Sequence, residues 1–284
     1  MDKNDMYNIY SFVSCNETWI PDLLIVIIAL VGLAGNGVVI SLLGCCMHRN
    51  AISVYILNLA SSDFLLLCCQ LINSLFIICY NRTYFIIMSI VLIPYITGLS
   101  ILSAISIERC LCVLWPIWYR CHRPRQMSAA MCALLWTLSL LFSVLEYYYS
   151  AFFHGVDKLR LVDFIVVAWL FLLLLTLSVS SLTILVRILY GSRRMPLSRL
   201  YVTILLTVLV FLICGLPFGI YWFLLYWFPI GLNDFLCGHL LSVTIVLSCI
   251  NSCANPIIYF LIGSFKQQHK SLKLALQRAL QDSS

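Results

Sequence analysis

Seven long runs of apolar residues constrain this chain more than any other feature of its sequence. Crossing about 30 Å of hydrocarbon takes roughly 20 helical residues, and every run reaches that length. Backbone groups in lipid must hydrogen bond within their own segment, and barrel strands would be shorter and alternate in polarity. We therefore predict an all-α membrane protein with helices at Leu23–Leu43, Ser53–Tyr80, Tyr84–Ser106, Ser128–Tyr149, Phe164–Ile188, Leu200–Phe228 and Phe235–Ile262.

The composition places the chain in a membrane rather than in water or on nucleic acid. Hydrophobic residues make up 63% of the 284 residues and charged residues only 10%, which is too apolar for a soluble domain of this length. The formal net charge of +6 could suit nucleic acid, but the Lys and Arg residues are spread over short connections beside the apolar runs. We attribute them to membrane topology and to contact with anionic lipid, and expect no nucleic-acid partner.

The positions of Lys and Arg predict the orientation of the chain. Alternate connections are basic, and they carry Arg49, Arg120, Arg123, Arg125, Arg193, Arg194, Arg199, Lys266, Lys270, Lys273 and Arg278. Because basic connections stay in the cytoplasm, residues 1–22 are expected outside the cell, 23–262 in the plasma membrane and 263–284 inside. The start of the chain lacks the pattern of a cleavable signal peptide, so the first span is expected to act as the signal anchor. The sequons at Asn16 and Asn81 then lie outside, where they could be glycosylated.

Polar side chains inside the apolar runs are costly in hydrocarbon, and each is a functional candidate. Asn36, in LAGNGVV, could equally serve only to hold helices together. Asp63, in NLASSDF, is different, because a carboxylate there needs a cation, a proton or a water-filled cavity. The last run contains Asn251 and the segment NPIIY, Asn255–Tyr259, in which Pro256 removes a backbone donor. Side chains or water must satisfy the carbonyl that this proline frees.

Glu108 and Arg109 stand side by side where the third run ends, in a chain that has few charges elsewhere. A pair at this position could hold Arg109 against its neighbour in one state and release it towards a cytoplasmic partner in another. The alternative is an interfacial pair whose side chains only reach towards water.

These motifs form an ordered set. GN in the first run, LNLASSD in the second, ER after the third, a lone Trp136 in the fourth, FLICGLPFG in the sixth and NPIIY in the seventh occur at matching depths. The set resembles a rhodopsin-like G-protein-coupled receptor over essentially the whole chain. GLSILSAISIERCL, WPIWYRCHRP and NSCANPIIYFLIGSFK further resemble Mas-related G-protein-coupled receptors, in particular the rodent A and B and primate X subfamilies.

The resemblance implies a seven-helix receptor over residues 23–262, with a short amphipathic eighth helix and tail in 263–284. It also implies activation of heterotrimeric G proteins of the Gq or Gi class, and expression in nociceptive or itch sensory neurons or in mast cells. The apolar and basic alternation in the tail, with Leu272, Leu276 and Lys273, fits a helix lying on the membrane.

The resemblance also assigns residues to activation. Arg109 would enter the G-protein interface beside Glu108, and Tyr259 of the segment with Asn255 and Pro256 would swing inward. The sixth span reads Cys-Gly-Leu-Pro and ends this motif at Pro217, so Gly215 replaces the tryptophan that is usual in relatives. Glycine and proline together still predict a bend in the helix. The sixth span also starts without an acidic residue, so we expect no ion pair between this span and Arg109. Without that ion pair the inactive state would be held weakly, and we expect some basal activity.

Asp63, Asn251 and Asn255 resemble the sodium and water cluster of this family. Gly98 stands where a third-span hydroxyl often helps to bind the ion, so we expect a weak structural Na⁺ site at most. The positions of Cys and His do not suggest a metal site of any other kind.

Two acids predict the ligand site. Glu146, near the outer end of the fourth span, and Asp163, near the outer start of the fifth, could face one cavity and attract a cation. Related receptors use acids at these positions to hold basic peptides and amphipathic amines. The alternative for Asp163 is a solvated acid stabilised by a helix N-terminus. Aromatic residues that could stack on a guanidinium or amine surround the same mouth, namely Tyr95, Trp222, Tyr226 and Trp227, although some could simply anchor the helices at the interface.

The chain lacks a pair of cysteines that its family usually joins in a disulfide bond. Close relatives join the outer ends of the fourth and fifth spans, but Ser150 and Leu159 occupy the matching positions here. We expect a looser loop over Ala151–Arg160 and weaker preorganisation of the acidic site. A Cys15–Cys237 bridge could partly substitute.

Three other functions compete with a working receptor. A transporter or channel could also place Asp63 and broken helices in a membrane, but no repeat relates two halves of the chain. An intramembrane hydrolase lacks a catalytic set, because every His lies near a span end, in a loop or in the tail, so we expect no enzyme. The lost cysteines raise a non-signalling receptor relic as the third alternative.

Overall fold

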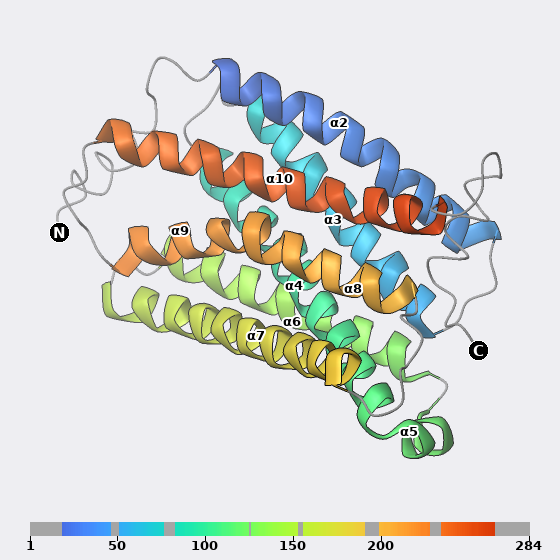
Figure 1. The fold of residues 1–284 in the computed structure, drawn as a ribbon. Coiled ribbons are helices and arrows are strands. Elements are labelled where there is room, and N and C mark those ends of the chain that lie inside the picture. The colour runs from blue at the N-terminus through green and yellow to red at the C-terminus, as the bar shows by residue number, and fades with distance from the viewer. Residues whose placement is uncertain are drawn as a thin grey trace.

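The computed structural model describes residues 19–46, 51–76, 83–124, 126–152, 156–190, 199–227 and 234–264, and these residues form helices and short connections (Figure 1). The elements in chain order are α2 (Trp19–Ser41), η1 (Leu42–Cys46), α3 (Ala51–Phe76), α4 (Thr83–Leu114), α5 (Pro116–His122), α6 (Met127–Phe152), α7 (Val156–Tyr190), α8 (Arg199–Val210), η2 (Phe211–Gly215), α9 (Leu216–Trp227) and α10 (Asp234–Ser264). The two η elements are single π-helical turns.

Seven segments of the described residues are long and apolar enough to cross a membrane, which confirms the seven predicted spans. The sixth consists of α8, η2 and α9 in succession. Large apolar side chains such as Leu30, Leu172 and Leu209 are exposed on the outer faces of the bundle, where lipid would surround them.

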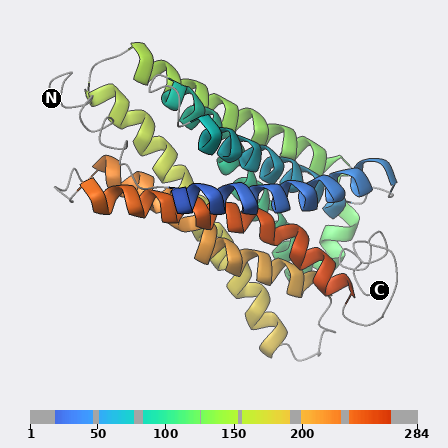
Figure 2. The same ribbon diagram turned by 90° about the horizontal axis from the view of Figure 1, so that it is seen from above.

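The helix α4 is the centre of the bundle. In its most apolar stretch 72% of the residues are buried, against 17% for α7. It packs against α3, α6 and α7, whereas α10 packs against α2, α3 and the three parts of the sixth span. Figures 1 and 2 show α2 running beside α10 on the side of the bundle away from α7.

The buried apolar residues form two clusters along the bundle. One lies towards the end that carries α5, here called the α5 end, and includes Tyr55, Ile105 and Tyr259. The other lies towards the opposite end and includes Val91 and Tyr95. Trp169 and Leu170 of α7 pack against both clusters and join them.

Some helices extend about two turns beyond the predicted ends of the membrane spans. The third helix continues past Glu108 to Leu114, and the segment after Trp115 forms the short helix α5 instead of a loop. The loop predicted over Ala151–Arg160 is largely helical, because α6 runs to Phe152 and α7 begins at Val156. The predicted eighth helix lies outside the described residues, which end at Ser264.

Gly32 allows α2 to approach α10 and α3 closely. A Cβ atom there would stand 2.6 Å from Cδ1 of Leu67 and in contact with the Sγ atom of Cys253. The Cys253 thiol donates to the carbonyl of Ile28 at 3.0 Å, which fixes its position on α2.

We expect Gly32→Ala to lower the free energy of unfolding by about 1–3 kcal/mol through overpacking. Gly44→Ala is the matched control, because a Cβ atom there would meet nothing within 4 Å. Thermal unfolding of the purified protein in detergent, followed by tryptophan fluorescence, measures both. Equal midpoints would show that the helices can separate at Gly32 without cost.

Candidate functional site

Glu108 is the hub of a polar cluster at the α5 end. Its Oε1 atom accepts hydrogen bonds from the Tyr55 hydroxyl at 2.8 Å and from Nη2 of Arg123 at 2.9 Å. Its Oε2 atom accepts from the Tyr119 hydroxyl at 2.7 Å and from the same Arg123 nitrogen at 2.9 Å. The Arg123 nitrogen also donates to the Ser128 hydroxyl at the start of α6. One carboxylate therefore connects α3, α4, α5 and the connection to α6.

Local sequence explains how α5 reaches this carboxylate. Pro116 is at the start of α5, where its missing N–H costs no helical hydrogen bond. Tyr119 and Arg123 are four residues apart and so project from one face of the turn. The helix ends at His122, and the next residue, Arg123, caps it with an extended ψ of 118° and an N–H that donates to the carbonyl of Tyr119.

Tyr119 of α5 and Arg123 at its end both keep their protons. Burial, followed by the hydrogen bond and the charge of Glu108, raises the pKa of the Tyr119 phenol above its usual range. Burial alone would lower the pKa of the Arg123 guanidinium, but the hydrogen bonds and charge of Glu108 outweigh it and raise that pKa. Tyr119 and Arg123 therefore both remain hydrogen-bond donors to the Glu108 carboxyl group at neutral pH.

The sequence had suggested Arg109 as the partner of Glu108, and the structure adds three donors that sequence reasoning missed. Arg109 is itself 5% exposed and lies on α4 one residue further on. Tyr119 and Arg123 follow a proline, which favours the start of a helix, but the segment after it is too short to show a helical period. Tyr55 is distant in sequence and carried no such signal.

A second polar cluster surrounds Asp63 in the middle of the bundle. The Nδ2 atom of Asn255 donates to Oδ2 of Asp63 at 2.6 Å, which joins α10 to α3. Nδ2 of Asn36 donates to the carbonyls of Gly32 and Ser252, both at 3.0 Å, which joins α2 to α10.

The chemistry of this cluster suits a hard cation or ordered water. The Oδ1 atoms of Asn36 and Asn255 are buried and accept no hydrogen bond from the described residues, and that of Asn255 belongs to the amide that contacts Asp63. Gly98 adds nothing, and a Cβ atom there would meet the Ser62 hydroxyl at 3.2 Å. Asn251, predicted for the same cluster, lies near Gly215 of the sixth span.

The sixth span is irregular where the usual tryptophan is missing. The π-helical turn Phe211–Gly215 ends just before Pro217. A Cβ atom at Gly215 would stand 2.7 Å from Cε2 of Phe211, so the Phe211 ring fills the space that a side chain would need. The Tyr95 hydroxyl donates to the carbonyl of Gly215 at 3.1 Å and ties α4 to this turn.

Ring packing also holds Tyr95 against the sixth span. Its ring meets that of Phe218 edge to face, with centroids 5.1 Å apart. A Cβ atom at Gly219 would be 2.7 Å from the Tyr95 hydroxyl oxygen, so the tyrosine occupies the space that this glycine leaves. The predicted ligand residue Tyr95 is thus buried against the sixth span, with 6% of its surface exposed.

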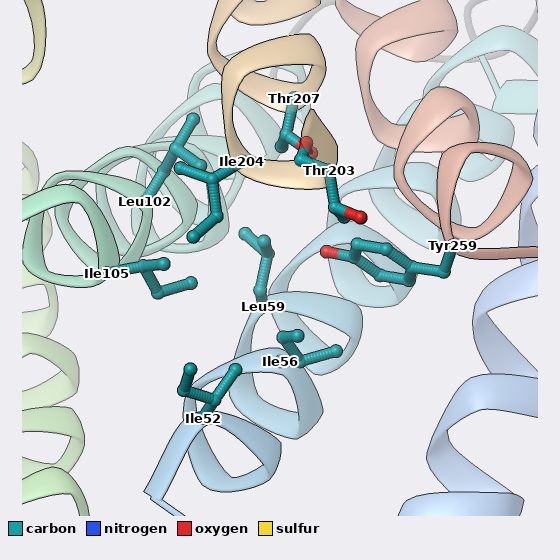
Figure 3. Close-up of a pocket in the computed structure, with 9 residues that line it drawn as sticks. All are labelled: Ile52, Ile56, Leu59, Leu102, Ile105, Thr203, Ile204, Thr207 and Tyr259. Atoms are coloured by element: carbon teal, nitrogen blue, oxygen red, sulfur yellow. Dashed lines mark hydrogen bonds between the residues drawn. The ribbon is translucent and has the colours of Figure 1, made fainter. Parts of the chain in front are cut away.

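Tyr259 faces a small apolar cavity towards the α5 end. Figure 3 shows its ring inside the bundle, with the hydroxyl directed towards Thr203 of α8. The other residues that line the cavity come from α3, α4 and α8, and they are Ile52, Ile56, Leu59, Leu102, Ile105, Ile204 and Thr207. The tyrosine that sequence reasoning expected to swing inward is inside the bundle in this structure, with 3% of its surface exposed.

The helices α6 and α7 pack as an antiparallel hairpin, and one ring contact shows which residues lie level with each other. Phe142 of α6 and Trp169 of α7 pack with centroids 5.9 Å apart. Glu146 lies one turn beyond Phe142, six residues before the end of α6, and Asp163 lies seven residues after the start of α7. At about 1.5 Å per residue the two positions are level in the hairpin, about 10 Å from the turn.

This register affects both predicted acids. Oε2 of Glu146 is buried, although the residue as a whole is partly exposed. Asp163 is seven residues after the start of α7, about two turns from the end where a helix dipole acts most strongly. The Asp163 side chain is outside the described part.

The remaining predicted residues lie wholly or partly outside the described part. Trp222, Tyr226 and Trp227 belong to α9, and Cys237 belongs to α10, but their side chains are not described. Cys15, Asn16 and Asn81 are in segments outside the described residues, so the disulfide bond and both glycosylation sites stay predictions.

Comparison with known proteins places this arrangement in a class. A family model described as 7 transmembrane receptor (rhodopsin family) matches residues 35–259, which include Asp63, Glu108 and Tyr259. Together with the seven spans, this match defines a seven-helix membrane receptor of the rhodopsin family, which is a signalling protein and not an enzyme.

Individual relatives narrow the class. Mas-related G-protein coupled receptor member X1 of Mus musculus is 57% identical to this chain, over 95% of the chain and 86% of that protein. Member X2 of Homo sapiens is 56% identical, over 94% of the chain and 84% of that protein. The chain belongs to the Mas-related G-protein-coupled receptors.

We expect Tyr95→Phe to lower the free energy of unfolding by about 1 kcal/mol, because the Gly215 carbonyl then loses its donor in an apolar setting. Tyr148→Phe on the exposed face of α6 is the control, and its effect should be smaller. Thermal unfolding of both variants in the same detergent measures the difference. An unchanged midpoint for Tyr95→Phe would mean that the hydroxyl contributes nothing to holding the sixth span.

Proposed function

We propose that this receptor binds a cationic peptide or an amphipathic amine at the end of the bundle opposite α5, which faces the outside of the cell. In response it catalyses nucleotide exchange on a heterotrimeric G protein at the α5 end, in the cytoplasm. The family resemblance favours the Gq and Gi classes, and nociceptive or itch sensory neurons or mast cells as the sites of expression. The receptor resides in the plasma membrane.

The level placement of Glu146 and Asp163 on the α6–α7 hairpin carries this proposal. Two carboxylates at the same depth lower the electrostatic potential between them and favour a ligand with positive charge. The Phe142 and Trp169 rings lie one to two turns further into the bundle, where an apolar part of an amphipathic ligand could pack. The buried Tyr95 limits how far a ligand could descend.

The G-protein end is supported by the cavity in front of Tyr259. Its lining comes from α3, α4, α8 and α10, so an outward movement of α8 would widen it. The buried Arg109 of α4 lies one turn beyond Ile105, which lines the cavity. An opening there would expose the arginine to a cytoplasmic partner.

The acidic site is tested with a C-terminally amidated peptide that alternates arginine and leucine. Calcium release and nucleotide exchange are measured in cells with matched surface levels of the wild type, Glu146→Gln and Asp163→Asn. We expect each neutralisation to raise the half-maximal concentration by at least about tenfold, because a partly desolvated charge pair is lost. Asp22→Asn, at the start of α2, controls for the general loss of negative charge.

The same assay separates the alternatives. An equal shift for all three variants would replace a defined site with general electrostatic attraction. Silence of the wild type towards basic peptides and amines, despite good surface staining, would favour the non-signalling relic.

We also propose that the Asp63 cluster holds water, or Na⁺ only weakly, because Gly98 provides no oxygen. Exchanging NaCl for choline chloride at constant ionic strength should change the dissociation constant of the same peptide less than about threefold. A large sodium dependence that disappears in Asp63→Asn would instead establish a strong ion site.

A further inference from the structure

The indole N–H of Trp169 is a buried hydrogen-bond donor. Its Nε1 atom is shielded from the surroundings, and no residue in the described part of the chain accepts a hydrogen bond from it. A buried donor without a partner costs free energy, and nearly all such groups in folded proteins are paired. Trp136, by contrast, donates its N–H to the side-chain oxygen of Asn58 at 3.1 Å. The Trp169 N–H is therefore ready to receive an acceptor that the described residues do not supply.

Trp169 lies on the face of α7 that points into the bundle. Val166 and Leu173 are buried on that face, and Trp169 stands three residues after the first and four before the second. Its ring packs against that of Phe142 on α6, with centroids 5.9 Å apart, and against both apolar clusters. The N–H therefore belongs to the interior between the helices and not to the lipid-facing side.

The two acids of the proposed ligand site lie outward of Trp169 on the same two helix faces. The Asp163 position is three residues before Val166 and so continues the inward face of α7. Glu146 is three residues after the buried Ser143 and continues the inward face of α6. Six residues separate Asp163 from Trp169, which is about 9 Å along the helix axis. A ligand that places a cation at the acids reaches the indole N–H at that depth.

We propose that Trp169 is a ligand-binding residue, whose N–H donates to an uncharged oxygen of the ligand. The ligand class is then narrower than an amphipathic amine, because it carries a carbonyl, ether or hydroxyl oxygen about 9 Å from its positive charge. A basic peptide meets this requirement with one cationic side chain and one backbone carbonyl. This inference rests on the proposed cation site at Glu146 and Asp163 and adds to that site a residue and a ligand group.

The physical reason is that a buried unpaired donor discriminates between ligands. A ligand with a methylene group at this depth leaves the N–H unpaired, whereas an oxygen pairs with a donor that has already lost its water. The receptor pays no further desolvation when that hydrogen bond forms. An oxygen in this place therefore raises the affinity above that of the apolar analogue.

The test combines two ligands with two side chains at position 169. The ligands are arylalkyl primary amines that differ in one group, a ketone or a methylene about 9 Å from the nitrogen. The side chains are tryptophan and the variant Trp169→benzothienylalanine, made by nonsense suppression, in which sulfur replaces the N–H and the shape is kept. Surface plasmon resonance on full-length receptor in lipid nanodiscs gives the dissociation constants.

We expect the wild type to bind the ketone about tenfold more tightly than the methylene compound, and Trp169→benzothienylalanine to bind the two alike. The methylene compound should bind both receptors equally, since it does not use the N–H. Trp136→benzothienylalanine is the matched control and should keep the preference for the ketone, because the Trp136 N–H is already engaged with Asn58.

Thermal unfolding without ligand tests the unpaired N–H separately. Trp136→benzothienylalanine should lower the midpoint, because Asn58 loses its donor. Trp169→benzothienylalanine should leave the midpoint unchanged or raise it, because a buried donor without a partner is removed. Equal losses in the two variants would show that the Trp169 N–H is satisfied in the free receptor, and would overturn the inference.

The binding results also separate this inference from the function on which it rests. Equal affinity of the wild type for the two amines, with both lost in Glu146→Gln, would keep the cation site and remove Trp169 from ligand binding. A preference for the ketone that survives in Trp169→benzothienylalanine would assign the oxygen to another donor. Binding of the amidated arginine–leucine peptide but of neither amine would overturn the inference as well. A wild type that binds none of these ligands would overturn the proposed cation site, and this inference with it.

Discussion

The structure depends on the need of every backbone N–H and C=O group in hydrocarbon to find a partner within the protein. The spans are helical for that reason, and each irregularity within a span needs a local solution. At η2, the carbonyl of Gly215 receives the Tyr95 hydroxyl from another helix. This irregularity lies in the middle of the sixth span, so the place where the helix is least regular is also where it is tied to the central helix α4.

Polar side chains in the spans fall into two groups, according to whether their hydrogen bonds stay within one helix or join two helices. Many hydroxyls donate to a carbonyl of their own helix, such as Ser139 to Leu135 and Thr207 to Thr203, and so satisfy themselves without linking elements. A smaller group crosses between helices, including Trp136 to Asn58 at 3.1 Å and Asn255 to Asp63. The second group contains the motif residues Asn36, Asp63, Glu108 and Asn255, whose contacts depend on two distant parts of the sequence.

The sequence predicted the seven spans closely, because length and hydrophobicity alone determine whether a segment can cross a membrane. It also selected Asp63, Asn255 and Glu108 correctly as unusual, since a charge or amide in an apolar run stands out. It could not predict the partners of Glu108, because Tyr55 and Arg123 approach it only after folding. It also missed α5, whose seven residues are too short to show a helical period. The hairpin of α6 and α7 was misjudged because the missing cysteines suggested a loose loop.

The helix α4 connects the two ends of the receptor. Tyr95 and Glu108 lie thirteen residues apart on it, which is about 20 Å along its axis. One end is tied to the π-helical turn of the sixth span, and the other to α3 and α5. Because α4 is the most buried span, it is better suited to serve as a fixed frame than to move. The sixth span packs mainly on α10 and only lightly on α4 and α7, so a movement of it away from α4 would disturb little packing. A change at the Tyr95 hydroxyl would therefore act on the sixth span directly, through the Gly215 carbonyl that it contacts.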